Sequence, residues 1–348
     1  MSLVRRIADH VAAAAGAEPF EPLALAAFEY QFDRVAPFRA LCERRGVAPG
    51  TIDSWRQVPL VPTEAFATVD LHSDPAREVF RSSGTTGARR SVHHHPFPEL
   101  YRAVIDATFP AHCLPRGDRP PMLALMPPRG VAPDSSLGFM VAHALERFGG
   151  EGSAWGTNAR GVEVGTCRSW LGIRQRAGTP VLVLATAFAL DDLLERIERM
   201  NLHFRLPTGS AIFETGGFKG RRREVSRAGL LERAAAWLGV PPGQVVSEYG
   251  MTELTSHAYT RTLAGGDPEL FVPPPWLRAR VLDPVTLEER PAGEIGLLAF
   301  FDLANVGSAL HVLSADLGRL DGPGFRLEGR APDADLRGCS LLAEELAD

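Results

Sequence analysis

The alternation of strand-like and helix-like segments between residues 122 and 200 constrains the fold of this chain more than any other feature. Met122–Met126 and Val181–Ala185 are short, uninterrupted apolar runs, as expected of buried strands. Ser135–Phe148 has a helical pattern, and Asp191–Met200 reads as a charged, amphipathic helix. Because parallel strands need crossover helices between them, this order predicts an α/β fold with a substantial parallel sheet.

The regions on either side have a different character. Residues 3–46 carry Ala, Leu and Phe at helical spacing, which predicts helices with a break near Pro37. Residues 277–314 predict a small antiparallel β region, with a subdomain boundary at the three prolines 273–275. Its expected strands are Leu277–Leu282, Gly293–Phe301 and Ala309–Leu313, with a turn at Asp283-Pro284. We therefore predict a core over residues 1–275, a β subdomain over 276–330 and a short tail over 331–348.

Composition and charge exclude several classes of protein. At 45% hydrophobic and 23% charged over 348 residues, the chain has enough apolar material for a large globular core. A net charge of −5 argues against a nucleic-acid partner or an anionic membrane surface. We find neither a membrane-length apolar window nor the apolar segment of a signal peptide, so a cytoplasmic location is expected.

Cysteine usage also favours a cytoplasmic location. The cysteines are far apart and form no Cys-x-x-Cys pair, which disfavours a structural zinc site and favours a reducing compartment. They are Cys42, Cys113, Cys167 and Cys339. The first three lie in apolar or helical contexts and are expected to be structural, whereas the last lies in the polar tail.

A run of small and hydroxylated residues follows the strand-like Glu78–Phe80. Its two glycines allow a sharp turn and a close approach to a ligand, and its N–H and hydroxyl groups can then surround a polyphosphate. The run consists of Ser82, Ser83, Gly84, Thr85, Thr86 and Gly87. Arg90 adds a fixed positive charge, although the run lacks the Gly-Lys-Ser/Thr ending of the common P-loop. The alternative is an ordinary Ser/Gly/Thr surface loop.

A second motif follows the apolar pair Val245-Val246. A tyrosine ring can stack on a flat base, a glycine permits close approach, and Thr and Glu can hold a cation beside phosphates. The motif consists of Tyr249, Gly250, Met251, Thr252 and Glu253. Taken alone it is a weak signal, because Tyr-Gly after a strand is usually just a turn.

Three further features of the sequence involve charged or histidine side chains. The glycine turn Gly216-Gly217 follows a predicted strand and delivers Lys219, the single lysine among 37 basic residues, whose compact ammonium differs from a planar guanidinium. Asp316 lies at a predicted strand end and is suited to accept bonds from ribose hydroxyls, and Arg330 follows Gly329. The histidines 93–95 are expected on a strand, where at most two share a side, and a metal role is disfavoured.

In this order the motifs resemble those of the adenylate-forming superfamily of acyl-CoA synthetases, luciferases and adenylation domains. The 82–87 run matches the phosphate loop, with Arg90 where lysine is usual, and residues 249–253 match the Tyr-Gly-x-Thr-Glu motif. Asp316 and Arg330 match the ribose-binding acid and the hinge-side arginine, and residues 280–299 match the β region before them. The resemblance implies the fold of the superfamily's N-terminal domain, with layered sheets, helices and a small antiparallel β subdomain.

One branch is especially similar, the LuxE-like acyl-protein synthetases of bacterial bioluminescence operons. The residues that carry this similarity are Val58–Phe66, Gly216–Lys219 and Arg337–Leu341. The resemblance implies ATP-dependent activation of a carboxylic acid, a fatty acid by analogy, to an acyl-adenylate, and transfer of the acyl group to a thiol. The implied cofactors are ATP and Mg²⁺, and the implied acceptor is a protein such as an acyl reductase or a carrier protein.

The roles of single residues follow from the same resemblance. Tyr249 would stack on adenine, Asp316 would hold the ribose, and Glu253 would bind Mg²⁺. Lys219 and Arg330 would balance the α-phosphate beside the turn of Gly216 and Gly217. The chain ends nine residues after Cys339, so we expect the superfamily's small mobile C-terminal domain, with its catalytic lysine, to be absent. Cys339 would carry the acyl group.

Two alternatives remain open at this stage. A natural-product adenylation enzyme would load a small or aromatic acid onto a separate carrier protein, and Cys339 would then have no role. A non-catalytic nucleotide-binding subunit of an acyl-reductase complex would bind ATP without activating any acid.

Overall fold

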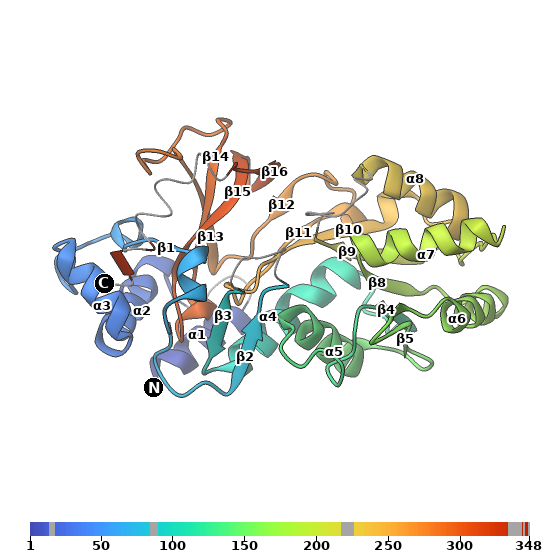
Figure 1. The fold of residues 1–348 in the computed structure, drawn as a ribbon, viewed down its shortest axis with the longest axis horizontal. Helices are drawn as coiled ribbons and strands as arrows, with labels where there is room; N and C mark the ends of the chain where they lie inside the picture. The colour runs from blue at the N-terminus through green and yellow to red at the C-terminus, as the bar shows by residue number, and fades with distance from the viewer. Residues whose placement is uncertain (14–17, 84–89, 217–225, 333–342, 344, 347–348) are drawn as a thin grey trace. The chain divides into compact units, whose positions relative to one another are not determined.

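The structure is a computed structural model that describes residues 1–13, 18–83, 90–216, 226–332, 343 and 345–346. The chain divides into two compact units (Figure 1). Unit 1 comprises Met1–Ala107, Met251–Ala258 and Val272–Asp348, and unit 2 comprises Thr108–Gly250 and Tyr259–Phe271. The predicted boundaries at residues 275/276 and 330/331 stay predictions.

Unit 2 is built on a parallel sheet. Its strands are short, all but one are almost wholly buried, and each pairs in parallel with the next, as the alternating sequence pattern predicts. In spatial order they are β10 (Val245–Tyr249), β9 (Ala211–Thr215), β8 (Leu182–Thr186), β4 (Met122–Leu125) and β5 (Ala154–Trp155). The predicted α/β fold is thereby confirmed.

Three of the helices of unit 2, α5, α7 and α8, begin where hydroxyl side chains cap them. Ser135, Thr186 and Ser226 each accept a hydrogen bond from a backbone N–H of the first turn, at 3.0 to 3.1 Å. The helices are α5 (Ser136–Phe148), α6 (Val164–Ala177), α7 (Ala187–Arg199) and α8 (Arg227–Leu238). The predicted helix at 191–200 begins earlier, at Ala187, because Thr186 caps it at the end of β8.

The apolar faces of α6, α7 and α8 pack on this sheet. Leu171, Leu194 and Ala234 are fully buried in one cluster with the strand residues Val183 and Ile212. The shorter elements of the unit are β6 (Thr157–Asn158), β7 (Gly161–Val162), η3 (Pro242–Gln244) and η4 (Thr262–Ala264). Helix α4 (Pro98–Cys113) and strands β11 (Ala258–Thr260) and β12 (Phe271–Val272) lie where the chain passes between units.

Unit 1 contains the predicted antiparallel β region. Neighbouring strands pair antiparallel in sequence order, and β1 (Val61–Pro62) pairs in parallel with β15. The strands are β13 (Leu277–Leu282), β14 (Gly296–Asp302), β15 (His311–Asp321) and β16 (Gly324–Arg330). A separate pair is formed by β2 (Glu78–Arg81) and β3 (Val92–His95).

The expected strand end at Asp316 is wrong, because β15 continues to Asp321. The register shifts between Leu317 and Gly318, and the ladder with β16 then resumes. A Cβ atom at Gly318 would lie 2.5 Å from the carbonyl oxygen of Arg326, so only glycine permits this approach of the two strands. Asp316 therefore lies inside a strand.

The N-terminal segment of unit 1 is helical, as predicted. Its helices are α1 (Leu3–Ala12), α2 (Phe20–Arg34) and α3 (Ala36–Arg44). The break predicted near Pro37 occurs at Val35, and Pro37 lies in the first turn of α3. Short 3-10 turns occur at η1 (Trp55–Gln57), η2 (Thr63–Ala67) and η5 (Leu303–Asn305). Among the helices that the structure describes, none combines the length and apolar character that crossing a membrane requires.

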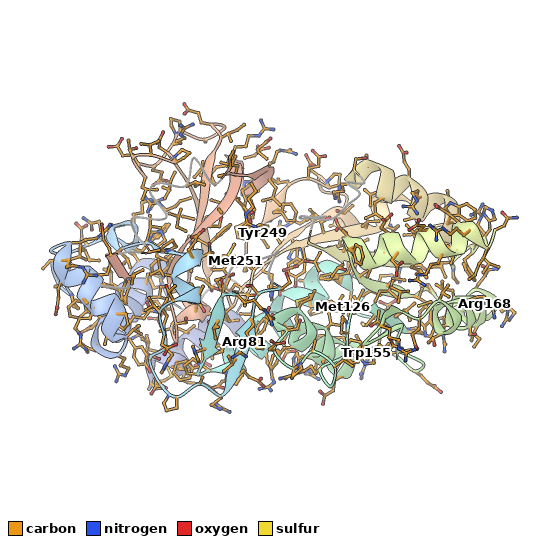
Figure 2. All side chains as sticks on the ribbon, viewed as in Figure 1. Arg81, Met126, Trp155, Arg168, Tyr249 and Met251 are labelled. Atoms are coloured by element: carbon orange, nitrogen blue, oxygen red, sulfur yellow. The ribbon has the colours of Figure 1, made fainter. Side chains whose placement is uncertain are left out.

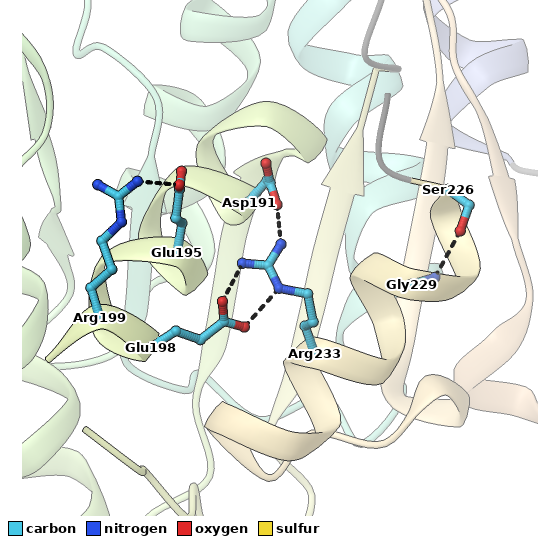
Figure 3. A network of polar contacts seen from close by, with 7 residues as sticks. All are labelled: Asp191, Glu195, Glu198, Arg199, Ser226, Gly229 and Arg233. Carbon is cyan, nitrogen blue, oxygen red and sulfur yellow. Dashed lines mark hydrogen bonds and ion pairs between the residues drawn. The ribbon is translucent and has the colours of Figure 1, made fainter. Parts of the chain in front are cut away.

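An ion-pair network joins α7 to α8 (Figure 3). The guanidinium of Arg233 bonds both carboxylate oxygens of Glu198, at 2.7 and 3.0 Å, and also bonds Asp191. Its side chain is only 22% exposed, whereas that of Arg199, which pairs with Glu195 one helical turn away, is 74% exposed. The two arginines therefore differ in how strongly water screens their pairs.

We predict that Arg233→Met lowers the free energy of unfolding by about 1–3 kcal/mol, because two half-buried carboxylates lose their shared cation. The matched variant Arg199→Met should change it by less than about 0.5 kcal/mol. Urea denaturation of both variants measures the difference, and equal losses would contradict this reading of the network.

Candidate active site

In unit 1 the two ends of the predicted phosphate loop are tied together at the ends of β2 and β3. The Ser82 N–H donates to the Ser91 carbonyl at 3.1 Å, and the Ser91 N–H donates to Ser82 Oγ at 3.0 Å. The Arg90 guanidinium donates to the carbonyl oxygens of Ser82 and of Arg81, the residue labelled in Figure 2. The predicted residues Gly84, Thr85, Thr86 and Gly87 lie outside the described residues, and Ser83 is exposed.

Glu253 lies close to this loop base. Its side chain is 6% exposed, and burial raises the pKa of the carboxyl above its ordinary value. A hydrogen bond with the Ser91 side chain and the charge of Arg330 oppose that effect, while the nearby Glu64 adds to it. The group predicted to bind a cation is thus surrounded by a hydroxyl, a guanidinium and a second carboxylate.

Asp316 and Arg330 stand directly opposite each other on β15 and β16. Asp316 is 9% exposed, and its N–H donates to Ser314 Oγ at 3.2 Å. Because Arg330 also acts electrostatically on Glu253, the structure brings three predicted residues of unit 1 into one neighbourhood. Met251 and Thr252, which precede Glu253, are half-buried in the same unit.

The remaining described candidates lie in unit 2. Tyr249 is the last residue of β10 (Figure 2), and its ring packs edge-on against Phe271 with centroids 6.1 Å apart. Gly216 follows the neighbouring strand β9 with φ of 70°, a conformation that favours glycine. The two residues therefore lie at the carboxyl edge of the parallel sheet, where ligands of such folds bind. Gly250 is exposed, and Gly217 and Lys219 lie outside the described residues.

Sequence reasoning missed two buried acids beside these positions. Glu248 is 6% exposed, and burial raises its pKa to about 7 although Thr215 donates a hydrogen bond to its carboxyl group. Glu214 belongs to the opposite face of the sheet, where it bonds Arg227 at 3.1 Å and the Ser247 hydroxyl at 2.6 Å. The available signal in the sequence was the presence of each acid within an otherwise apolar strand.

The histidine run lies on β3, as predicted. His93 and His95 share the buried face of the strand, and His94 on the other face lies 3.3 Å from the Asp70 carboxylate. Within the described ranges, no group of three or more His, Cys, Asp and Glu side chains is arranged to hold a metal ion. Cys42, Cys113 and Cys167 are buried, and burial raises the pKa of each thiol.

Solved structures with the same fold include an acid–CoA ligase with a bound acyl-adenylate and an ATP-bound protein. An open conformation of 2-hydroxyisobutyryl-CoA ligase, in complex with 2-HIB-AMP and CoA, matches with a TM-score of 0.65 at 18% identity, covering 90% of this chain and 70% of that chain. ATP-bound MatB from Rhodopseudomonas palustris matches with a TM-score of 0.52 at 20% identity, covering 76% and 50%. The fold is therefore that of the adenylate-forming ligases.

Sequence comparison narrows the class to one family. The long-chain-fatty-acid–luciferin-component ligase of Vibrio harveyi is 22% identical over 331 residues, which cover 90% of this chain and 84% of that protein. Residues 174–347 match the family model described as acyl-protein synthetase, LuxE. The chain belongs to the LuxE family of acyl-protein synthetases, and the resemblance drawn from its motifs is confirmed. It is accordingly an enzyme of ATP-dependent acid activation and acyl transfer.

The buried Glu248 gives a pH-dependent prediction. Its pKa is about 7 in the folded protein and 4.5 in its ordinary state, so between these values the folded protein keeps a proton that the unfolded chain has lost. The free energy of unfolding therefore falls as pH rises through this window, by up to about 1.4 kcal/mol per pH unit.

Glu248→Gln removes this dependence, so its stability relative to the natural protein should rise from about pH 5 to pH 7 and then level off. Urea denaturation of both proteins across this pH range measures the difference in their free energies of unfolding. Glu232→Gln, on the exposed side of α8, controls for the change of charge. A pH-independent difference for Glu248→Gln would contradict the assignment.

Proposed function

We propose that this protein uses ATP to convert a fatty acid into its acyl-adenylate and then transfers the acyl group through the Cys339 thiol to a partner protein. Membership of the LuxE family supports the reaction class. The name of the Vibrio harveyi relative specifies a long-chain fatty acid, which supports the choice of acid. The acceptor would be the active-site thiol of an acyl reductase or the thiol of a carrier protein.

The observation that carries this proposal is the cluster around Glu253 in unit 1. The Ser91 side chain interacts with Glu253, and the Ser91 backbone N–H bonds Ser82 at the base of the predicted phosphate loop. Arg330, which lies opposite Asp316 in the β15–β16 ladder, acts on the same carboxylate. A loop base, a carboxylate, an arginine and the acid opposite that arginine therefore lie in one neighbourhood, which supports binding of a nucleoside triphosphate there.

In the first step, a substrate carboxylate oxygen would attack the α-phosphorus of ATP. A new P–O bond forms as the bond to the α,β-bridging oxygen breaks, and pyrophosphate leaves. The loop N–H groups and Arg330 would stabilise the charge that develops on the phosphates. We assign Lys219 to the α-phosphate on the same grounds of charge, and the roles of Tyr249 and Asp316 toward adenine and ribose remain part of the proposal.

The residues around Glu253 fit Mg²⁺. That ion is usually held by one or two carboxylates together with substrate phosphates and waters, and Glu253 with the neighbouring Glu64 provides such oxygens. When bound, the ion would neutralise charge on the departing pyrophosphate. Glu253 would have to be ionised for this, and Ser91 and Arg330 both favour the ionised form.

In the second step the Cys339 thiolate would attack the acyl carbonyl carbon. A C–S bond forms, the bond to the AMP oxygen breaks, and AMP leaves with the electron pair. The thioester then exchanges with a thiol of the partner protein. Cys339 lies outside the described residues, and its role rests on the resemblance to acyl-protein synthetases.

We expect the protein to catalyse fatty-acid-dependent exchange of labelled pyrophosphate into ATP and to hold labelled acyl groups covalently. Cys339→Ser should abolish the thioester label and spare the exchange, because adenylation precedes the thiol step. Cys42→Ala, at a fully buried cysteine, is the control and should leave both unchanged. Thioester label that survives Cys339→Ser would remove this residue from the scheme.

Glu253→Gln should lower the exchange rate by about 100-fold or more and raise the Mg²⁺ concentration needed for half-maximal rate, because a neutral amide is a poor ligand for this ion. Exchange measured across a range of Mg²⁺ concentrations tests this. Glu294→Gln, at an exposed position, provides the matched control. An unchanged Mg²⁺ dependence in Glu253→Gln would show that the ion binds elsewhere.

A further inference from the structure

Buried side chains bind the backbone on both sides of Glu253. The carbonyl oxygen of Thr252 lies 2.7 Å from His93 Nδ1, and since a carbonyl only accepts, this nitrogen carries the proton. The carbonyl oxygen of Glu253 itself accepts from Asn305 Nδ2 at 2.9 Å. Both donors are almost fully buried, so water does not compete for these bonds.

Both the nitrogen and the oxygen of the Asn305 side-chain amide are hydrogen-bonded to neighbouring groups. Its second amide hydrogen goes to the Ala309 carbonyl at 2.6 Å, and its Oδ1 accepts from the Thr255 hydroxyl at 2.8 Å. Two carbonyls on one side of the amide and a donating hydroxyl on the other fix which atom is nitrogen and which is oxygen. His95 Nε2, 3.0 Å from Thr255 Oγ1, then donates to that hydroxyl.

Asp302 holds two residues that follow Glu253 in the chain, Thr255 and Ser256. One of its carboxylate oxygens accepts from the N–H groups of Thr255 and Ser256, at 3.0 and 2.7 Å. The other accepts from the Ser256 hydroxyl at 2.7 Å. Asp302 is completely buried at the end of β14, so the backbone of Thr255 and Ser256 is held at the end of this strand.

The turn that carries Asn305 is itself anchored. Gln31 of α2, also completely buried, donates to the carbonyls of Ser308 and Asn305 at 2.7 and 3.2 Å and accepts from the Leu310 N–H at 3.2 Å. A helix, a strand end and a turn thus converge on one short segment. Its one acidic side chain is Glu253.

We propose that Asn305 is a positioning residue, which holds the backbone of Glu253 so that its carboxylate is already oriented for the metal–nucleotide complex. This inference rests on the proposed function, in which Glu253 binds Mg²⁺. Removing the amide would leave the Glu253 carbonyl without its donor and let the carboxylate adopt other orientations. Side chains that orient metal ligands without touching the metal typically contribute 10- to 100-fold to metal affinity.

The test compares two variants of the same turn. Asn305→Ala removes the donor to Glu253, whereas Ser308→Ala removes an equally buried side chain that donates to the Leu71 carbonyl at 2.8 Å and does not touch Glu253. Binding of Mn²⁺ is measured by electron paramagnetic resonance on the full chain, in the presence of an ATP analogue with a methylene group between the α- and β-phosphorus.

We expect Asn305→Ala to raise the dissociation constant for Mn²⁺ about 10-fold or more and Ser308→Ala to leave it within about twofold. If Asn305→Ala does not fold, Thr255→Val is used, because it is nearly isosteric and removes the hydroxyl that orients the Asn305 amide and accepts from His95. It should shift the constant in the same direction.

Unchanged Mn²⁺ affinity in the Asn305 or Thr255 variant, or an equal loss in Ser308→Ala, would overturn the positioning role. Failure of the proposed function looks different, because the natural protein would then show no acid-dependent pyrophosphate exchange. A natural protein that exchanges, beside an Asn305→Ala variant with normal Mn²⁺ affinity, overturns the positioning role alone.

Discussion

The geometry of the candidate site in unit 1 depends on one buried carboxylate. Asp302 is completely buried, and a charged or polar group in that position must have its hydrogen bonds satisfied. Thr255 and Ser256 provide those bonds, and the Trp276 indole N–H adds another to the Ser256 hydroxyl at 3.0 Å. These bonds hold the backbone two and three residues after Glu253, on whose carboxyl group Ser91 and Arg330 act.

The sequence predicts the elements whose cause is local. The parallel strands of unit 2 are recognisable because buried strands are short apolar runs, and helix starts are marked by capping residues such as Ser135. The motifs around Ser82 and Tyr249 are recognisable because glycines and hydroxyls cluster after strands. Asp316 was misplaced because the continuation of β15 depends on a register shift at Gly318, which only the partner strand reveals.

Asp302 and Asn305 could not have been identified from one sequence. They interrupt an apolar run from Phe300 to Val306, which by itself reads only as the end of a strand. Their partners, from Glu253 to Ser256, lie about 50 residues earlier, and hydrogen bonds at that separation leave no periodic pattern. The sequence therefore identifies Glu253, the proposed Mg²⁺ ligand, but not Asp302 and Asn305, which hold its segment in place.

Glu248 and Glu253, five residues apart, show how neighbouring groups affect the ionisation of two buried acids. Burial favours the protonated form of both, and at each acid a hydroxyl donor opposes this effect while a second carboxylate adds to it. The charge of Arg330 favours ionisation at Glu253 alone. The account is tested most directly by anomalous diffraction from crystals of the protein grown with Mn²⁺ and a non-hydrolysable ATP analogue. It predicts an anomalous peak at direct coordination distance from the Glu253 carboxylate, with residues 252–256 unmoved; a peak away from Glu253 would contradict it.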